Sequence, residues 1–309
     1  MNICLTSGMH SSPGTSPASP IFAAQNTIVE KLLFLFFTGL FFTSQALTAQ
    51  SIITSNVNAE LYTGTAAGQP LLVGLGGSEG GNAWSSDYWK PTRDSFLADG
   101  YAFLALGYFG SKGTPAILDR IAIDQVHAAI LEAAKNPLVD GSRIAIIGGS
   151  RGGDLALLLG SYYTDITCVV AIVPSHVTFP GHTSHFTSPA WTFGGKDLPF
   201  VPVNEAAVPF LKKQDLRGAF SAMLLDSVAE KSAMIPVEKI NGPVLLLSAT
   251  EDRICPSTPM CEKMSTRLTQ YKFPFHTEHH AIKGGHGEPL KHFPLVRQFL
   301  RDYFRKSAS

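Results

Sequence analysis

One serine of this chain lies in a run of glycines that is typical of a nucleophile. Residues 148–153 read Gly-Gly-Ser-Arg-Gly-Gly and contain the pattern G-x-S-x-G around Ser150. An apolar run over 144–147 precedes this segment, and a helical pattern over 151–162 follows it. Such glycines let a strand turn sharply into a helix, whose N-terminus favours negative charge developing near the serine. The pattern predicts that Ser150 is a nucleophile; an ordinary helix N-cap is the alternative interpretation.

A serine hydroxyl is a weak nucleophile, so it needs a histidine base and a carboxylate that orients this base. After a G-x-S-x-G turn the two partners follow along the chain in the order acid, then histidine. A strand over 244–247 runs into Glu251 and Asp252, and a later strand runs into His286 on a glycine-rich loop. Asp252 is preferred to Glu251 because it lies further into its loop, although either could be a solvated loop carboxylate. We predict Ser150, Asp252 and His286 as the catalytic residues.

Acyl transfer at a serine also needs backbone N–H groups that bind the oxyanion. We expect one from Arg151, the residue after the nucleophile, and another from the turn 76–81, at Gly77 or Ser78. This turn matches neither G-x-G-x-x-G nor G-x-x-x-x-G-K-[ST], the patterns of dinucleotide and phosphate loops. We therefore expect no nucleotide and no other cofactor.

The remaining histidines and the cysteines do not indicate a metal site. Three histidines fall within 276–280, on a predicted strand whose alternation would place them on opposite faces. Cys168 lies in an apolar run, where we expect it to be a buried small hydrophobic residue. Cys255 and Cys261 are close enough in sequence to pair in an oxidising compartment, but spacing alone does not give their geometry.

Strands and helices alternate from residue 66 onward. This alternation predicts an α/β fold with a doubly wound, mostly parallel sheet covered on both sides. Residues 175–242, rich in Pro, Gly, Phe and His, break the alternation, and we expect an insertion that walls the site beyond the strand ends. The expected strands are 71–75, 101–106, 143–147, 166–173, 244–247 and 273–282, and the expected helices are 85–99, 117–135, 151–162, 257–270 and one from Pro294.

Composition excludes two classes of protein. Hydrophobic residues make up 45% of the chain and charged residues 16%, which supplies a core and argues against disorder. Lys plus Arg and Asp plus Glu both number 24, the formal net charge is zero, and no basic cluster occurs. We therefore expect no nucleic-acid partner.

The first 49 residues differ from the rest of the chain. Residues 2–20 are rich in Ser, Pro, Gly and Thr, the composition of a disordered leader. The uncharged apolar run 32–42 is short for a membrane span of about 20 residues and is typical of the core of a secretory signal. We expect cleavage of a signal peptide, export to the periplasm or the medium, and a single catalytic domain over 50–309. An uncleaved segment would instead anchor the protein in a membrane.

Taken together, residues 71–304 resemble the C-terminal catalytic domain shared by acyl-CoA thioesterases and bile acid-CoA:amino acid N-acyltransferases. The resemblance implies an α/β-hydrolase fold and a catalytic triad of Ser150, Asp252 and His286. The amino-acid-conjugating members use cysteine where this chain has Ser150, which favours hydrolysis over transfer to an amine. The matching segments are 76–81, 148–153, 199–203, 235–240, 252, 285–286 and 293–295.

We therefore expect a serine hydrolase that cleaves a small-molecule acyl ester or thioester through an acyl-enzyme intermediate. The same residues could instead cleave a carboxylic ester or a lactone. A hydrolase fold that binds a ligand without turnover is the alternative from another class.

Overall fold

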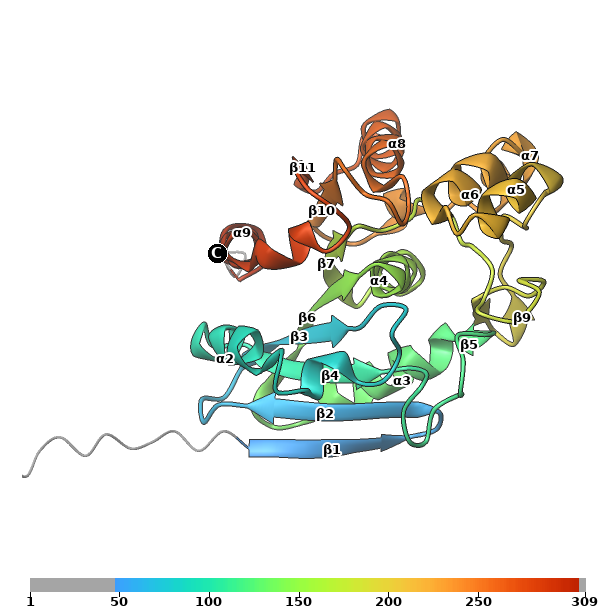
Figure 1. Ribbon diagram of the computed structural model, residues 1–309. Helices are drawn as coiled ribbons and strands as arrows, with labels where there is room; N and C mark the ends of the chain where they lie inside the picture. The colour runs from blue at the N-terminus through green and yellow to red at the C-terminus, as the bar shows by residue number, and fades with distance from the viewer. Residues whose placement is uncertain (1–47, 306–309) are drawn as a thin grey trace, which may run out of the picture. The chain divides into compact units, whose positions relative to one another are not determined.

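The computed structural model describes residues 48–305 (Figure 1). Within them, eight strands form one sheet in the order β1-β2-β4-β3-β6-β7-β10-β11. The pairs β1–β2 and β2–β4 are antiparallel, and every other neighbouring pair is parallel. The doubly wound, mostly parallel sheet is therefore confirmed. Its strands are β1 (Thr48–Thr54), β2 (Val57–Thr63), β3 (Gln69–Leu75), β4 (Ala102–Gly107), β6 (Val139–Gly149), β7 (Ile166–Ile172), β10 (Val244–Ala249) and β11 (Thr277–Ile282).

Helices cover both faces of this sheet, because the central strands carry apolar side chains on each side. The helices α3 (Ile123–Ala134), α4 (Arg151–Tyr162) and α8 (Ser257–Gln270) contribute to the apolar core on one face. On the other face, α2 (Lys90–Ala98) and α9 (Phe293–Phe299) pack Phe96, Phe293 and Phe299 against the strands. The chain then ends its described part in a π-helical turn, Leu300–Phe304.

The structure corrects two predicted helices and adds a hairpin that was not predicted. This hairpin consists of β1 and β2, and residue 50 lies within β1. Residues 121–122 form β5 (Ile121–Ala122), so the helix expected over 117–135 begins at Ile123. The helix expected over 85–99 begins at Lys90, after a 3-10 turn, Ala83–Ser85.

The insertion before β10 consists of short helices and a small sheet. Strands β8 (Trp191–Phe193) and β9 (Lys196–Asp197) pair with each other, and β8 also pairs with β5. Next come η2 (Glu205–Ala207), three helices that lie together in Figure 1, and η3 (Val237–Lys239). Phe179, Val201 and Met223 form part of a separate apolar cluster here. The three helices are α5 (Val208–Lys212), α6 (Leu216–Met223) and α7 (Ser227–Ser232).

The predicted leader and apolar segment within 1–47 lie outside the described residues. Among the helices of residues 48–305, none has the length and apolar character needed to cross a bilayer.

Candidate active site

Ser150 connects β6 to α4 in a strained backbone conformation. Its φ of 53° and ψ of −122° are costly for a residue with a side chain. Its N–H donates to the carbonyl of Ile172 at 2.8 Å, and its carbonyl accepts from the N–H of Gly153 at 2.8 Å. Ser150 occupies the N-cap position of α4, but within residues 48–305 its hydroxyl makes no helix-capping hydrogen bond.

The glycines of G-x-S-x-G are required by close backbone packing. A Cβ on Gly148 would overlap the carbonyl oxygen of Gly152, and a Cβ on Gly152 would overlap that of Gly76. Both obstacles are main-chain atoms, which cannot rotate away as a side chain can. The elbow therefore brings β6, α4 and the turn after β3 into direct contact.

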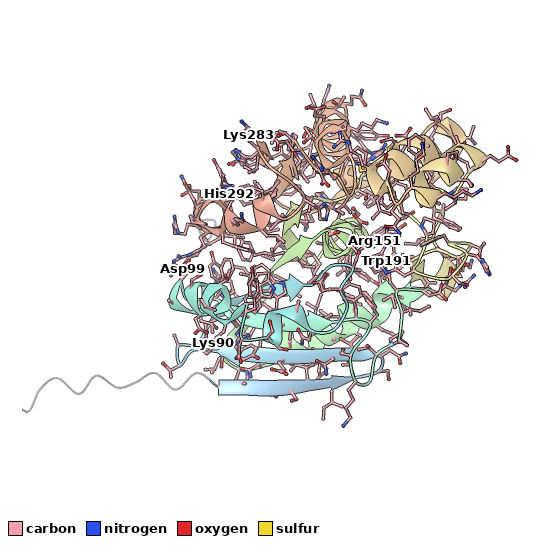
Figure 2. All side chains as sticks on the ribbon, in the orientation of Figure 1. Lys90, Asp99, Arg151, Trp191, Lys283 and His292 are labelled. Carbon is pink, nitrogen blue, oxygen red and sulfur yellow. The ribbon has the colours of Figure 1, made fainter. Side chains whose placement is uncertain are left out.

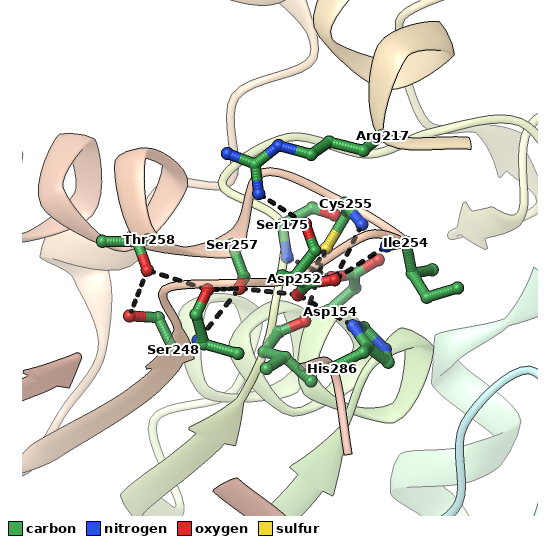
Figure 3. A network of polar contacts seen from close by, with 12 residues as sticks. Asp154, Ser175, Arg217, Ser248, Asp252, Ile254, Cys255, Ser257, Thr258 and His286 are labelled. Atoms are coloured by element: carbon green, nitrogen blue, oxygen red, sulfur yellow. Dashed lines mark hydrogen bonds and ion pairs between the residues drawn. The ribbon is translucent and has the colours of Figure 1, made fainter. Parts of the chain in front are cut away.

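Asp252 and His286 meet beside the C-terminal end of β10 (Figure 3). The Nδ1 atom of His286 lies 2.8 Å from Oδ2 of Asp252. Glu251, the alternative acid, is exposed, and its backbone N–H bonds to the carbonyl of Gly284. The structure thus brings Asp252, rather than Glu251, to His286.

The Asp252 carboxylate is fully buried but well supplied with donors. Ser257 Oγ donates to Oδ2 at 2.7 Å, while the backbone N–H groups of Ile254 and Cys255 donate to Oδ1 at 2.9 and 3.1 Å. The main-chain carbonyl of Asp252 also accepts from the guanidinium of Arg217, a residue of α6. Burial alone would raise the pKa of Asp252, but His286, Ser257 and the backbone donors outweigh it and lower this pKa.

A cavity of about 670 Å³ opens where Ser150 and His286 lie. Most of its lining is apolar, from the ends of the strands and from the insertion, as expected for residues 175–242. Within the described part of the chain, the Ser150 hydroxyl has no hydrogen-bond partner, so it is free to face a ligand. The apolar walls include Trp84, Trp89, Phe186, Leu211, Leu216, Phe220 and Met223.

The turn predicted to bind an oxyanion lies against the nucleophile. A Cβ placed on Gly77 would lie 3.3 Å from Cβ of Ser150. The N–H of Gly77 donates to the Glu79 carboxylate at 2.9 Å, and Ser78 is exposed at the cavity. Arg151 is the first residue of α4, a position whose N–H a helix does not use internally.

Sequence reasoning missed an ion pair behind the elbow. The Arg151 side chain, at the insertion-facing end of α4 (Figure 2), donates to the carbonyl of Pro180 at 2.6 Å and lies 3.4 Å from Asp154. Asp154, almost fully buried, accepts from the N–H of Ser175 at 2.7 Å. Burial raises the pKa of Asp154 to about 6, against the opposing charge of Arg151. The signal that could have revealed this ion pair is Asp154 itself, an acid in the first turn of α4. The sequence alone indicated only that such an acid is typical of a helix N-terminus.

The three histidines within 276–280 and the described cysteines do not belong to a separate metal site. His276 and His280 both bond to the Glu278 carboxylate, whereas His279 bonds to Ser248. The cysteines within residues 48–305 are buried free thiols, so Cys255 and Cys261 form no disulfide there. In the same range, one group of three potential metal ligands has its ligand atoms within 4.8 Å of one another: Asp252, Cys255 and His286. This group contains the Asp252–His286 pair of the candidate active site.

A family model described as "BAAT / Acyl-CoA thioester hydrolase C terminal" matches residues 127–308. The chain belongs to this family. The matched segment contains Ser150, Asp252 and His286, so the candidate site lies within the family's own domain. The resemblance expected from the sequence is confirmed.

Individual curated proteins that are similar to this chain agree with the family assignment. The chain is 28% identical to the peroxisomal succinyl-coenzyme A thioesterase of Mus musculus over 171 residues, 55% of this chain and 38% of that protein. It is 30% identical to acyl-coenzyme A thioesterase 6 of Mus musculus over 202 residues, 63% of this chain and 43% of that protein. The chain thus spans about two-fifths of the length of these curated relatives.

Solved structures show the same architecture. The acylaminoacyl peptidase of Pyrococcus horikoshii superposes with a TM-score of 0.62 at 15% identity, over 89% of this chain and 44% of that one. At this identity the similarity establishes the fold alone. The α/β-hydrolase fold expected for the chain is confirmed.

Proposed function

We propose that this family member hydrolyses an acyl thioester or ester through an acyl-Ser150 intermediate. The observation that carries the proposal is His286, which is bonded to the buried Asp252 and lines one cavity together with a serine on a strained strand-to-helix turn. The serine–histidine contact commonly tightens only when substrate is bound.

The proposed reaction assigns one step to each of these residues. His286, held through Nδ1 by Asp252, takes the Ser150 proton at Nε2 while Oγ attacks the acyl carbonyl. The N–H groups of Arg151 and Ser78 stabilise the oxyanion, because the N–H of Gly77, the other expected donor, already donates to the Glu79 carboxylate. His286 returns the proton to the leaving thiol or alcohol, and a water that His286 deprotonates then releases the acid and frees Ser150.

Two features favour an apolar acyl group on a thioester. The cavity walls are largely aromatic and aliphatic, which suits a hydrocarbon chain. The two curated relatives are named as a succinyl-coenzyme A thioesterase and an acyl-coenzyme A thioesterase, which favours a thioester. The residue at the elbow of this chain is Ser150, and water can hydrolyse an acyl ester of serine.

The test is a fluorophosphonate probe and a substrate panel applied to the chain and to its Ser150→Ala variant. We expect the probe to label the unmodified chain and not the variant, and hydrolysis to fall by at least about 10³-fold. Parallel acyl-CoAs, short-chain aryl esters and lactones identify the leaving group. Full labelling of Ser150→Ala would contradict the assignment, and no turnover on any panel member by a folded chain would favour a binding role.

A further inference from the structure

The cavity beside Ser150 carries a carboxylate that the hydrolytic steps do not use. The charged side chains lining it are Glu79, Arg151 and Asp154, in addition to the histidines His182 and His286. Arg151 is already bonded to Asp154 and to a backbone carbonyl. Within residues 48–305, Glu79 forms no ion pair, so its negative charge is uncompensated by a side chain of the cavity.

Glu79 lies close to the reacting atoms. Its Oε1 accepts from the N–H of Gly77 at 2.9 Å, and a Cβ on Gly77 would lie 2.9 Å from its Oε2. The same point lies 3.3 Å from Cβ of Ser150. The distance between the Glu79 carboxylate and Cβ of Ser150 therefore cannot exceed the sum of these two short distances. A substrate carbonyl attacked by Ser150 must lie in the field of this carboxylate.

We propose that Glu79 sets the charge selectivity of the site: neutral and cationic acyl groups are accepted, and acyl groups with their own carboxylate are rejected. The inference rests on the proposed acyl hydrolysis and specifies its substrate class. A succinyl-type carboxylate would be repelled by Glu79 and would find no free cation among the described residues of the cavity. The phosphates of a coenzyme A leaving group are separated from the reacting carbonyl by the neutral pantetheine arm, so they are affected less.

The replacement Glu79→Gln isolates this charge. A glutamine retains a side-chain oxygen that can accept from Gly77, so the turn keeps its hydrogen bond while the charge is removed. Any change in oxyanion binding affects all acyl groups alike and cancels in a ratio of kcat/KM values.

The experiment compares butyryl and succinyl thioesters, which share four carbons and one leaving group, together with the 4-(trimethylammonio)butyryl thioester. If the substrate panel selects another leaving group, the same acyl groups are placed on that group. We expect the unmodified chain to prefer butyryl over succinyl, and Glu79→Gln to reduce this preference about tenfold. In the same variant, kcat/KM for the cationic substrate should fall relative to kcat/KM for the butyryl thioester. Added salt should weaken the preference in the unmodified chain more than in Glu79→Gln.

Glu205→Gln is the matched control, because it removes the same charge from an exposed residue of the insertion that does not line the cavity. It should leave the butyryl-to-succinyl ratio unchanged. An unchanged ratio in Glu79→Gln, with butyryl hydrolysis intact, would overturn the charge selectivity alone. Absence of Ser150-dependent turnover of every acyl group would overturn the proposed function and this inference with it.

Discussion

The Asp252 carboxylate combines complete burial with an ionised state. A buried carboxylate normally favours its protonated form, but donors from His286, Ser257 and two backbone N–H groups satisfy both oxygens here. The bond to Nδ1 fixes the His286 tautomer and leaves Nε2 to act as the base. In the proposed reaction, the role of Asp252 is to orient His286.

Replacing this acid tests its assignment. We expect Asp252→Asn to lower kcat/KM by about 10³- to 10⁴-fold, because an amide stabilises the wrong His286 tautomer and cannot balance an imidazolium. Glu251→Gln, a change at the neighbouring exposed carboxylate, should alter kcat/KM by less than about threefold. Steady-state kinetics with a thermal unfolding control measure both, and equal losses in the two variants would contradict the choice of Asp252.

The positions of the candidate site residues could be predicted from the sequence, but the contacts that support these residues could not. Ser150, Asp252 and His286 each follow a strand in a fixed order along the chain, and strand periodicity reveals such positions. Ser257, Arg217 and Glu79 meet the site through loop and insertion geometry that no periodicity encodes. Such contacts depend on tertiary packing.

At the scale of secondary-structure elements, the elbow is held by backbone contact. We expect Gly148→Ala to unfold the chain or destabilise it by at least about 3 kcal/mol, since its Cβ would meet the Gly152 carbonyl. Gly149→Ala is the control: the new Cβ would meet only the flexible end of Leu290, at 3.3 Å. Soluble yield and urea unfolding distinguish the two, and equal stability of both variants would refute the packing argument.

Asp154 joins α4 to the segment after β7 and should give the fold a pH-dependent stability. Its folded-state pKa of about 6 exceeds its unfolded value of about 4. Between these values the folded state holds a proton that the unfolded state has released, so the free energy of unfolding falls as pH rises.

Asp154→Asn removes this dependence. Between pH 4 and 7 we expect the unfolding free energy of the unmodified chain to fall relative to that of the variant, by at most about 3 kcal/mol. Urea unfolding across this range measures it. Asp87→Asn, at an exposed position, should give a curve parallel to that of the unmodified chain. A parallel curve for Asp154→Asn would show that burial does not raise its pKa.

Helices and strands with a strong apolar pattern were predicted, whereas strands without such a pattern were missed. The predicted bounds of α4 and α8 agree with the structure, because each carries a long helical pattern beside a buried strand. Strand β1 carries polar side chains at an edge of the sheet, and β5 has two residues, so neither leaves a clear period. Pairing with distant partners, rather than local pattern, defines them.

At the scale of the whole molecule, an ion pair connects α2 and α9, two helices that lie far apart in the sequence. Arg297 of α9 donates to both carboxylate oxygens of Asp99, at the end of α2, with distances of 2.6 and 2.7 Å. These hydrogen bonds lower the pKa of Asp99 despite its partial burial. The pair therefore stabilises the fold above the unfolded pKa of about 4, and this contribution is lost as pH falls through the lower folded value.

Arg297→Ala should destabilise the protein by about 1–2 kcal/mol at pH 7 and by less at pH 3. Breaking the exposed pair of Lys90 and Asp94 within α2 by Lys90→Ala should cost about 0.5 kcal/mol or less. Urea unfolding at the two pH values tests both. A loss for Arg297→Ala that is independent of pH would assign its effect to packing instead of charge.

The insertion was predictable as an interruption but not in its internal structure. Its position followed from the break in strand–helix alternation, and the cavity walls agree with that position. Its helices have between five and eight residues, which are too short for a reliable helical period. Their separate apolar cluster includes Val177, Val201 and Met260 of α8. These residues are far apart in the sequence, so no local pattern predicts the cluster.

The strand order also determines how much of the chain must leave the ribosome before the sheet can form completely. Strand β7 lies between β6 and β10, yet the whole insertion is synthesised before β10 leaves the exit tunnel. During that interval the apolar residues of β7 present an open edge, the kind of edge on which nascent chains aggregate. At that stage Ser150 has been synthesised, whereas Asp252 and His286 have not. Nascent chains that stop before β10 are thus the ones for which a holding chaperone matters.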